Sequence, residues 1–249
     1  MRSLLVVVVV VFALLLGACA DRVPPTDEVV LCDRSSSAAI CDETVVRRAG
    51  GAFLDINPPP GSRFVVLVVG CSVEDVSRQY EIRVPERWGR GAVRKRRHWQ
   101  EVERKRLANL TLPSVNQCSA VSAGIWRTAR VFAERPGTNQ RFILVSDLRE
   151  VNRPLGINFE RKVSAPADFV GKLRKARLLA DLSGVQTSVC GVHDRATPDA
   201  PTWTARRAQQ LHLAWNSAFA AMGIPDIRLT ESCDFEISRN QISMAGRTR

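Results

Sequence analysis

Proline and glycine are scarce in this chain, with 13 and 15 residues among 249, and no internal repeat or low-complexity tract is visible. This composition excludes collagen, a coiled coil and disorder as descriptions of the whole chain. The cysteines form no CxxC pair, which argues against a zinc ribbon, and no glycine-rich phosphate loop occurs. The 45% of hydrophobic residues instead predict one globular domain with a sizeable core.

Acidic residues are also in short supply: 25 Asp and Glu stand against 36 Lys and Arg, which gives a net charge of +11. Such a surface favours anionic partners, such as phospholipid headgroups, nucleic acid or acidic protein patches. The most basic stretch covers residues 86–107, and its second half has a helical pattern. A solvated basic helix is the simpler interpretation of this stretch. Its candidate anion-binding residues are Arg94, Lys95, Arg96, Arg97, Arg104, Lys105 and Arg106.

The apolar run at residues 4–16 is too short to span a bilayer, which takes about 20 residues, but it has the length of a signal-peptide core. It ends in the sequence LGAC at residues 16–19. This ending resembles the lipobox of bacterial lipoproteins, in which a peptidase cleaves before a cysteine that carries the lipid. The resemblance implies a lipid-modified Cys19. An ordinary secretory signal, cleaved near Ala18 or Ala20, is the alternative.

Acyl chains on Cys19 would hold the chain on a membrane without a transmembrane helix. The next residue is Ala20 and not Asp, which resembles the pattern for sorting Gram-negative lipoproteins to the outer membrane. We therefore expect a cell-envelope protein, on the outer membrane facing the periplasm if the host is Gram-negative. The expected organisation is a signal peptide at 1–18, a tether at 19–27, a folded domain at 28–232 and a tail at 233–249.

Besides Cys19, the chain has an even number of cysteines, and an oxidising compartment then permits up to three disulfides. Two of them, Cys32 and Cys190, lie in apolar runs and could equally be small buried hydrophobes. We expect at least one disulfide and leave the pairing open. The six cysteines are Cys32, Cys41, Cys71, Cys118, Cys190 and Cys233.

Short, nearly continuous runs of β-branched and aliphatic residues alternate with helical patterns. Such runs predict the strands of a parallel sheet that is covered on both faces, in a doubly wound α/β domain. The four main strands are expected at residues 28–32, 63–71, 141–146 and 185–192. Further strands are expected at 79–84 and 226–229, and helices at 37–53, 119–134, 167–182 and 204–222.

The first predicted strand runs directly into Asp33, Ser35 and Ser37, a DxSxS pattern. Ligands of open α/β sheets bind outside the carboxyl ends of the strands, so this position suits a site. One carboxylate and two hydroxyls offer the hard oxygen ligands that Mg²⁺ prefers. A cap on the following helix is the alternative role for these residues.

A second acidic strand end follows at Ser146 and Asp147, and Ser119 opens a helical pattern between the two strand ends. Together these residues resemble the metal-ion-dependent adhesion site of von Willebrand factor A-like domains. That family has DxSxS after the first strand, a Thr before a later helix and an Asp at the end of the fourth strand. The resemblance implies that a divalent cation, Mg²⁺, Mn²⁺ or Ca²⁺, is held by Asp33, Ser35, Ser37, Ser119 and Asp147.

The resemblance covers about residues 28–229 and implies a mostly parallel six-stranded sheet with helices on both faces. Ser119 stands where the family has Thr, which keeps the hydroxyl, and Thr111 competes for this role. In the family, an acidic side chain of a partner protein completes the coordination of the metal. The same fold with a vestigial, metal-free site is the alternative.

An enzyme is a less suitable interpretation. Cys190 and His193 would lie on opposite faces of a strand, which prevents direct pairing of nucleophile and base. Asp33 lacks the second Asp of a phosphotransferase, because Ser35 stands there. We therefore expect a non-catalytic binding protein that takes no small-molecule substrate. The alternative is a metal-independent module in which residues 87–106 bind anionic lipid, glycan or nucleic acid, nucleic acid being the least expected. A chelator would release the partner in the first case, and salt in the second.

Overall fold

The computed structural model describes residues 23–35, 41–114, 118–192 and 204–233. Its strands are β1 (Thr26–Cys32), β2 (Arg63–Val68), β3 (Ser77–Arg83), β4 (Asn139–Val145), β5 (Val151–Asn152), β6 (Ile157–Asn158), β7 (Gln186–Cys190) and β8 (Leu229–Thr230). Its helices are α2 (Glu43–Asp55), α3 (Ala92–Ala108), α4 (Val121–Ala133), the 3₁₀ turn η1 (Arg153–Leu155), α5 (Pro166–Lys175) and α6 (Ala205–Ala221).

Six strands form one sheet in the order β3-β2-β1-β4-β7-β8. All neighbours are parallel except β3, which pairs antiparallel with β2 at one edge. The chain moves outward from β1 in one direction through β2 and β3, and in the other through β4, β7 and β8. This order confirms the predicted doubly wound α/β fold, and its topological switch point lies between β1 and β4.

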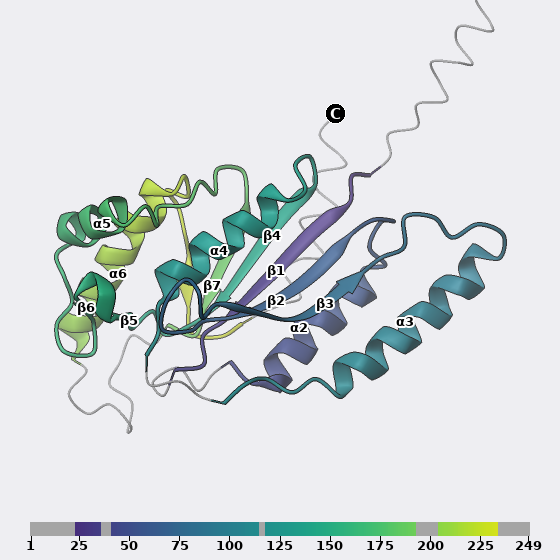
Figure 1. The fold of residues 1–249 in the computed structure, drawn as a ribbon, viewed down its shortest axis with the longest axis horizontal. Coiled ribbons are helices and arrows are strands. Elements are labelled where there is room, and N and C mark those ends of the chain that lie inside the picture. Colours follow the sequence, from purple (N-terminus) through teal and green to yellow (C-terminus); the bar gives the residue numbers. More distant parts are fainter. Residues whose placement is uncertain (1–22, 36–40, 115–117, 193–203, 234–249) are drawn as a thin grey trace, which may run out of the picture.

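Two apolar cores cover the two faces of the sheet, as Figure 1 shows with α4, α5 and α6 on one side and α2 and α3 on the other. Alternate residues of β1 contribute to each, so Val29 and Leu31 face the first core and Val30 and Cys32 the second. A side chain on Gly124 of α4 would meet Leu31 at 2.8 Å. A glycine at this position therefore lets α4 pack closely against β1.

The first strand is longer than predicted, because β1 begins at Thr26 and not at residue 28. The amide of Thr26 donates to the hydroxyl of Ser62 at 2.9 Å. The buried Asp27 carboxylate accepts hydrogen bonds from Arg63 and Arg135, each at 2.7 Å. These contacts fix both residues in the sheet.

Two helix boundaries also differ from the predictions. The helix predicted from residue 37 begins at Glu43, where the Asp42 carboxylate caps it by accepting from the amide of Val45 at 2.8 Å. The helix predicted to reach residue 182 ends at Lys175, because Arg177 adopts a left-handed conformation with φ of 59°.

Three disulfides join Cys32 to Cys41, Cys71 to Cys118 and Cys190 to Cys233. Cys32 and Cys190 are therefore cystines and not free buried thiols. The last of these bonds joins Cys233 to the end of β7. No helix in the described ranges is long and apolar enough to cross a membrane.

Candidate functional site

Asp33 lies at the carboxyl end of β1, beside the end of β4, where its amide donates to the carbonyl of Val145 at 2.9 Å. Its side chain is fully buried. Carboxylate oxygen Oδ2 accepts the hydroxyls of Ser119 at 2.9 Å and Ser146 at 2.7 Å. Oδ1 accepts the amide of Ser35 at 3.0 Å, and the Ser35 hydroxyl also bonds to this carboxylate. Three serines from three parts of the chain thus converge on one carboxylate.

Ser119 reaches Asp33 because the segment before α4 is held against the hairpin formed by β5 and β6. The amide and carbonyl of Ser119 form a bridge with Val151, and the amide of Ala120 donates to the carbonyl of Gly70 at 2.9 Å. Thr111 is instead exposed in the connection after α3. Of the two residues that the sequence left in competition, Ser119 is the one that contacts Asp33.

Asp147 follows Ser146 at the end of β4 and is buried. Its oxygen Oδ1 accepts the amide of Arg149 at 3.0 Å, and Oδ2 lies 3.5 Å from Nε of the same residue. Between them, Leu148 has a positive φ of 61°, and its carbonyl accepts from the indole of Trp215 at 2.8 Å. The buried Trp215 thus fixes the turn that carries Asp147.

Burial raises the pKa of Asp33, although the hydrogen bonds from Ser146, Ser119 and Ser35 act in the opposite direction. A buried carboxylate is destabilised by its own charge unless a cation or further donors compensate for it. The hydrogen bonds from the three serines therefore offset only part of the cost of burying this charge.

Glu150 is a buried acid of this region that the sequence analysis did not identify. It caps α4 from outside the helix, because Oε2 accepts the amide of Ser122 at 3.1 Å and Oε1 accepts the hydroxyl of the same residue. Asn152 also donates to Oε1 at 3.1 Å. No sequence pattern marks this role, since Glu150 and Ser122 meet only through the fold. The other contacts that we did not foresee are made by Ser146, which directly precedes Asp147, and by Arg149, which follows it by two residues.

The Glu150 carboxyl is expected to make the stability of the domain depend on pH. Burial raises its pKa to about 7 from 4.5, and the charge of Asp33 acts in the same direction. Between pH 4.5 and about pH 7, Glu150 keeps a proton in the folded state that it has lost in the unfolded chain. The free energy of unfolding therefore falls as the pH rises. Glu150→Gln should reduce this slope and be more stable than the parent at about pH 8, by at most about 3 kcal/mol.

Urea unfolding of the two proteins at about pH 5 and about pH 8 measures this effect. Glu101→Gln is the control, because Glu101 is an exposed acid on α3. If the Glu150→Gln and parent proteins lost the same stability between the two pH values, the assignment of this proton to Glu150 would be wrong.

Other predicted site residues lie elsewhere. Ser37 and Cys19 are outside the described residues, as is His193. The basic residues of the second half of 86–107 lie on α3, which begins at the opposite edge of the sheet from Asp33. Within the described residues no three His, Cys, Asp or Glu side chains gather as a metal site.

Models of known protein families and curated protein sequences give no match to this chain. Among solved structures, BatB from Bacteroides thetaiotaomicron aligns at 12% identity and a TM-score of 0.45, over 90% of this chain and 100% of that one. The pilus adhesin SpaC from Lactobacillus rhamnosus GG aligns at 14% and 0.48, over 90% of this chain and 30% of that one. A von Willebrand factor type A protein from Catenulispora acidiphila aligns at 13% and 0.38, over 81% and 43%.

These likenesses concern the fold and not the function. The strand order of this chain, with one antiparallel edge strand, and its two helical layers give it a von Willebrand factor A-like fold. Because the identities and TM-scores are this low, the chemistry of the site has to be inferred from the residues of this chain alone.

Proposed function

We propose that this chain is a lipid-anchored protein of the cell envelope that binds a partner protein through a divalent cation. Asp33, Ser35, Ser119 and Asp147 would hold the cation, with Ser37 as the further ligand that the DxSxS pattern supplies. Cys19 would carry the lipid. The protein would act by binding and not by catalysis.

The observation that carries this proposal is the convergence of three serine hydroxyls on the buried Asp33 carboxylate, at the switch point of a doubly wound sheet. Carboxylate and hydroxyl oxygens are hard ligands that fit Mg²⁺, Mn²⁺ or Ca²⁺. The donor set therefore fits the cation. Arg149 lies 3.5 Å from Asp147, so a cation would have to share this carboxylate with a guanidinium.

A bound cation would supply an electrophilic centre to which a carboxylate of a partner coordinates. Two carboxylates and neutral hydroxyls leave a divalent ion with unfilled positions, and an acidic side chain of the partner would complete them. Binding would then depend on the metal and select for an acidic residue.

The first test is the melting temperature of residues 20–249 with EDTA and with millimolar Mg²⁺ or Mn²⁺. This chain keeps every described strand and helix and all three disulfides. A cation at about 100 times its Kd stabilises the native state by about 2.7 kcal/mol, which is a rise of roughly 5–10 °C for a domain of this size. The rise should disappear in both Asp33→Asn and Asp147→Asn.

Asp226→Asn is the matched control, because Asp226 is an exposed carboxylate outside the site. This variant should keep the full rise. An equal rise in the parent and in all three variants would place the cation elsewhere, and no rise in the parent would make the site vestigial.

A further inference from the structure

The N-terminal part of α3 is an unusually exposed and basic helix segment. Only Glu103 and Leu107 of the whole helix are buried, and both lie in its second half. The first turns contain no acid, have no side-chain cap and carry four consecutive basic residues, Arg94, Lys95, Arg96 and Arg97. Arg94 and Arg97 are three residues apart on one face of the helix and repel each other, and the positive end of the helix dipole adds to the cost of all four charges. This arrangement destabilises the free helix, and an anionic partner would relieve it.

Few of these charges are neutralised within the described part of the chain. Arg104 pairs with Asp55, and Arg106 pairs with Glu103. Arg96 donates to the amide oxygen of Asn57 and lies over the Trp88 ring at 5.4 Å. Arg94, Lys95 and Arg97 form no ion pair among the described residues. Two exposed acids, Glu86 and Glu101, only partly offset this excess.

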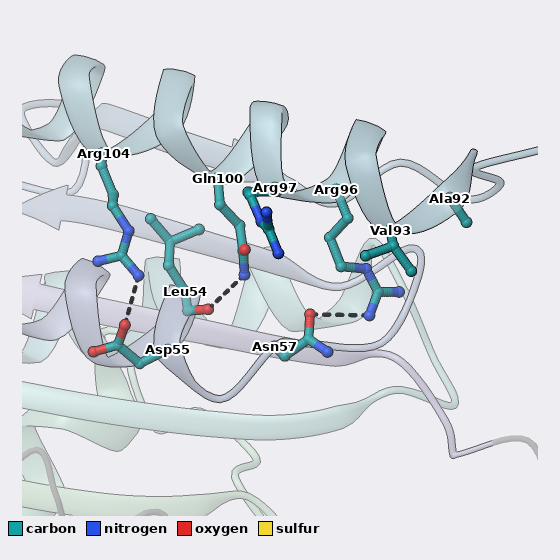
Figure 2. A pocket seen from close by; sticks show the side chains of 9 residues that line it. All are labelled: Leu54, Asp55, Asn57, Ala92, Val93, Arg96, Arg97, Gln100 and Arg104. Atoms are coloured by element: carbon teal, nitrogen blue, oxygen red, sulfur yellow. Dashed lines mark hydrogen bonds and ion pairs between the residues drawn. The ribbon is translucent and has the colours of Figure 1, made fainter.

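A cavity of about 570 Å³ opens between the end of α2 and the start of α3, as Figure 2 shows. Three arginines line it, and one of them, Arg104, is already held by Asp55. Arg97 points into the same space without a carboxylate partner in the described ranges. Val93, which is 76% exposed, stands at its margin. Arg96 and Arg97 thus line this space without a carboxylate partner among the residues that the structure describes, and Val93 adds an apolar side chain. Such a lining fits a phosphate group that is attached to an apolar chain.

The topology places this surface at the amino edge of the sheet, where the chain enters the domain. In the register of the sheet, Asp27 of β1 lies opposite Arg63 of β2, and Arg63 lies opposite Arg83 at the end of β3. The chain leaves β3 at this edge, and α3 begins soon after and runs toward the opposite edge (Figure 1). The basic start of α3 therefore lies at the end of the molecule that a lipid on Cys19 would hold close to a membrane.

We propose that the start of α3 binds the anionic phospholipid surface to which the chain is tethered, with Arg94, Lys95 and Arg97 contacting headgroup phosphates. The site around Asp33, at the carboxyl edge, then faces away from the membrane and toward a partner. The orientation rests on the proposed anchor at Cys19, whereas the lipid contact itself requires neither the anchor nor a metal.

Residues 20–249, which lack Cys19, isolate this contact from the anchor. Binding is measured by sedimentation with vesicles of phosphatidylcholine that contain about 30% phosphatidylglycerol, at low salt. We expect binding to these vesicles, none to pure phosphatidylcholine, and a steep loss as NaCl is added. Each basic residue near an anionic surface contributes about fivefold, so Arg94→Gln, Lys95→Gln and Arg97→Gln together should weaken binding about 100-fold.

The matched control combines Arg161→Gln, Arg174→Gln and Lys175→Gln, which removes the same charge from exposed residues on and before α5, on the other face of the sheet. It should weaken binding only a few-fold. Equal losses in the two triple variants would show a nonspecific effect of net charge and overturn the proposal, as would stronger binding to duplex DNA than to the vesicles. EDTA should leave vesicle binding unchanged, so this result is independent of the metal test.

Discussion

Asp27→Ala is expected to lower the free energy of unfolding by about 3–5 kcal/mol, because it leaves a buried guanidinium without its main partner. Arg63 is 2% exposed and donates to Asp27 at 2.7 Å. Its other partners are Glu134 and the carbonyl of Val131. Arg135, which also bonds to Asp27 at 2.7 Å, loses the same carboxylate. The cost comes mainly from Arg63, which cannot be solvated where it lies, whereas the Arg135 side chain is 31% exposed and can turn to water.

The matched control is Asp55→Ala, which removes the carboxylate of an exposed ion pair with Arg104. Such pairs contribute at most about 1 kcal/mol. Urea denaturation of the oxidised proteins measures both variants through the shift of the midpoint at an unchanged slope. Similar small shifts for the two variants would mean that Arg63 finds water or another acceptor when Asp27 is absent.

Trp215→Ala should be about as damaging, with a loss of about 3–5 kcal/mol or more. Trp215 is fully buried on α6 and packs edge-on against Phe169, with the ring centroids 5.0 Å apart. Its removal leaves a large cavity and an unpaired carbonyl at Leu148. Because Leu148 directly follows Asp147, the loss should also weaken the cation dependence of the melting temperature.

Trp215→Phe separates these two effects, because it keeps most of the ring and removes only the indole donor. A smaller loss of stability, about 1–3 kcal/mol, together with a weakened response to the cation would link the Leu148 hydrogen bond to the site. Trp126→Ala is the control, since Trp126 is only half-buried and its ring contact with Arg130 spans 5.8 Å. Trp215→Ala, Trp215→Phe and Trp126→Ala are all measured by thermal unfolding with and without cation.

The sequence was most informative where local chemistry decides the structure. Apolar runs correctly indicated β1, β2, β4 and β7, because strand segments that are buried on both faces need consecutive apolar residues. In β7 this holds only for Val189 and Cys190, and the residues before them are polar and more exposed. The two acidic strand ends at Asp33 and Asp147 were placed at the correct edge, and Ser119 was found from its position before a helix. The metal itself stays a prediction.

What the sequence did not reveal depends on register and on distant contacts. Ser146 meets Asp33 because Cys32 of β1 lies opposite Val145 of β4, and no local pattern encodes this alignment. Strands β5 and β6 have two residues each, which is too short for any periodicity. Glu150 directly precedes β5 and is buried because of this hairpin, so its burial could not be predicted either.

The three disulfides lie at the carboxyl edge, where they adjoin the candidate site. Asp33 directly follows Cys32, and Ser119 directly follows Cys118. The bond from Cys32 to Cys41 closes a loop around the segment that carries Ser35. In a reduced chain this loop would have to be ordered by the cation itself, at an entropic cost that weakens binding. The ratio of cation Kd values before and after reduction would measure how far this disulfide preorganises the proposed site.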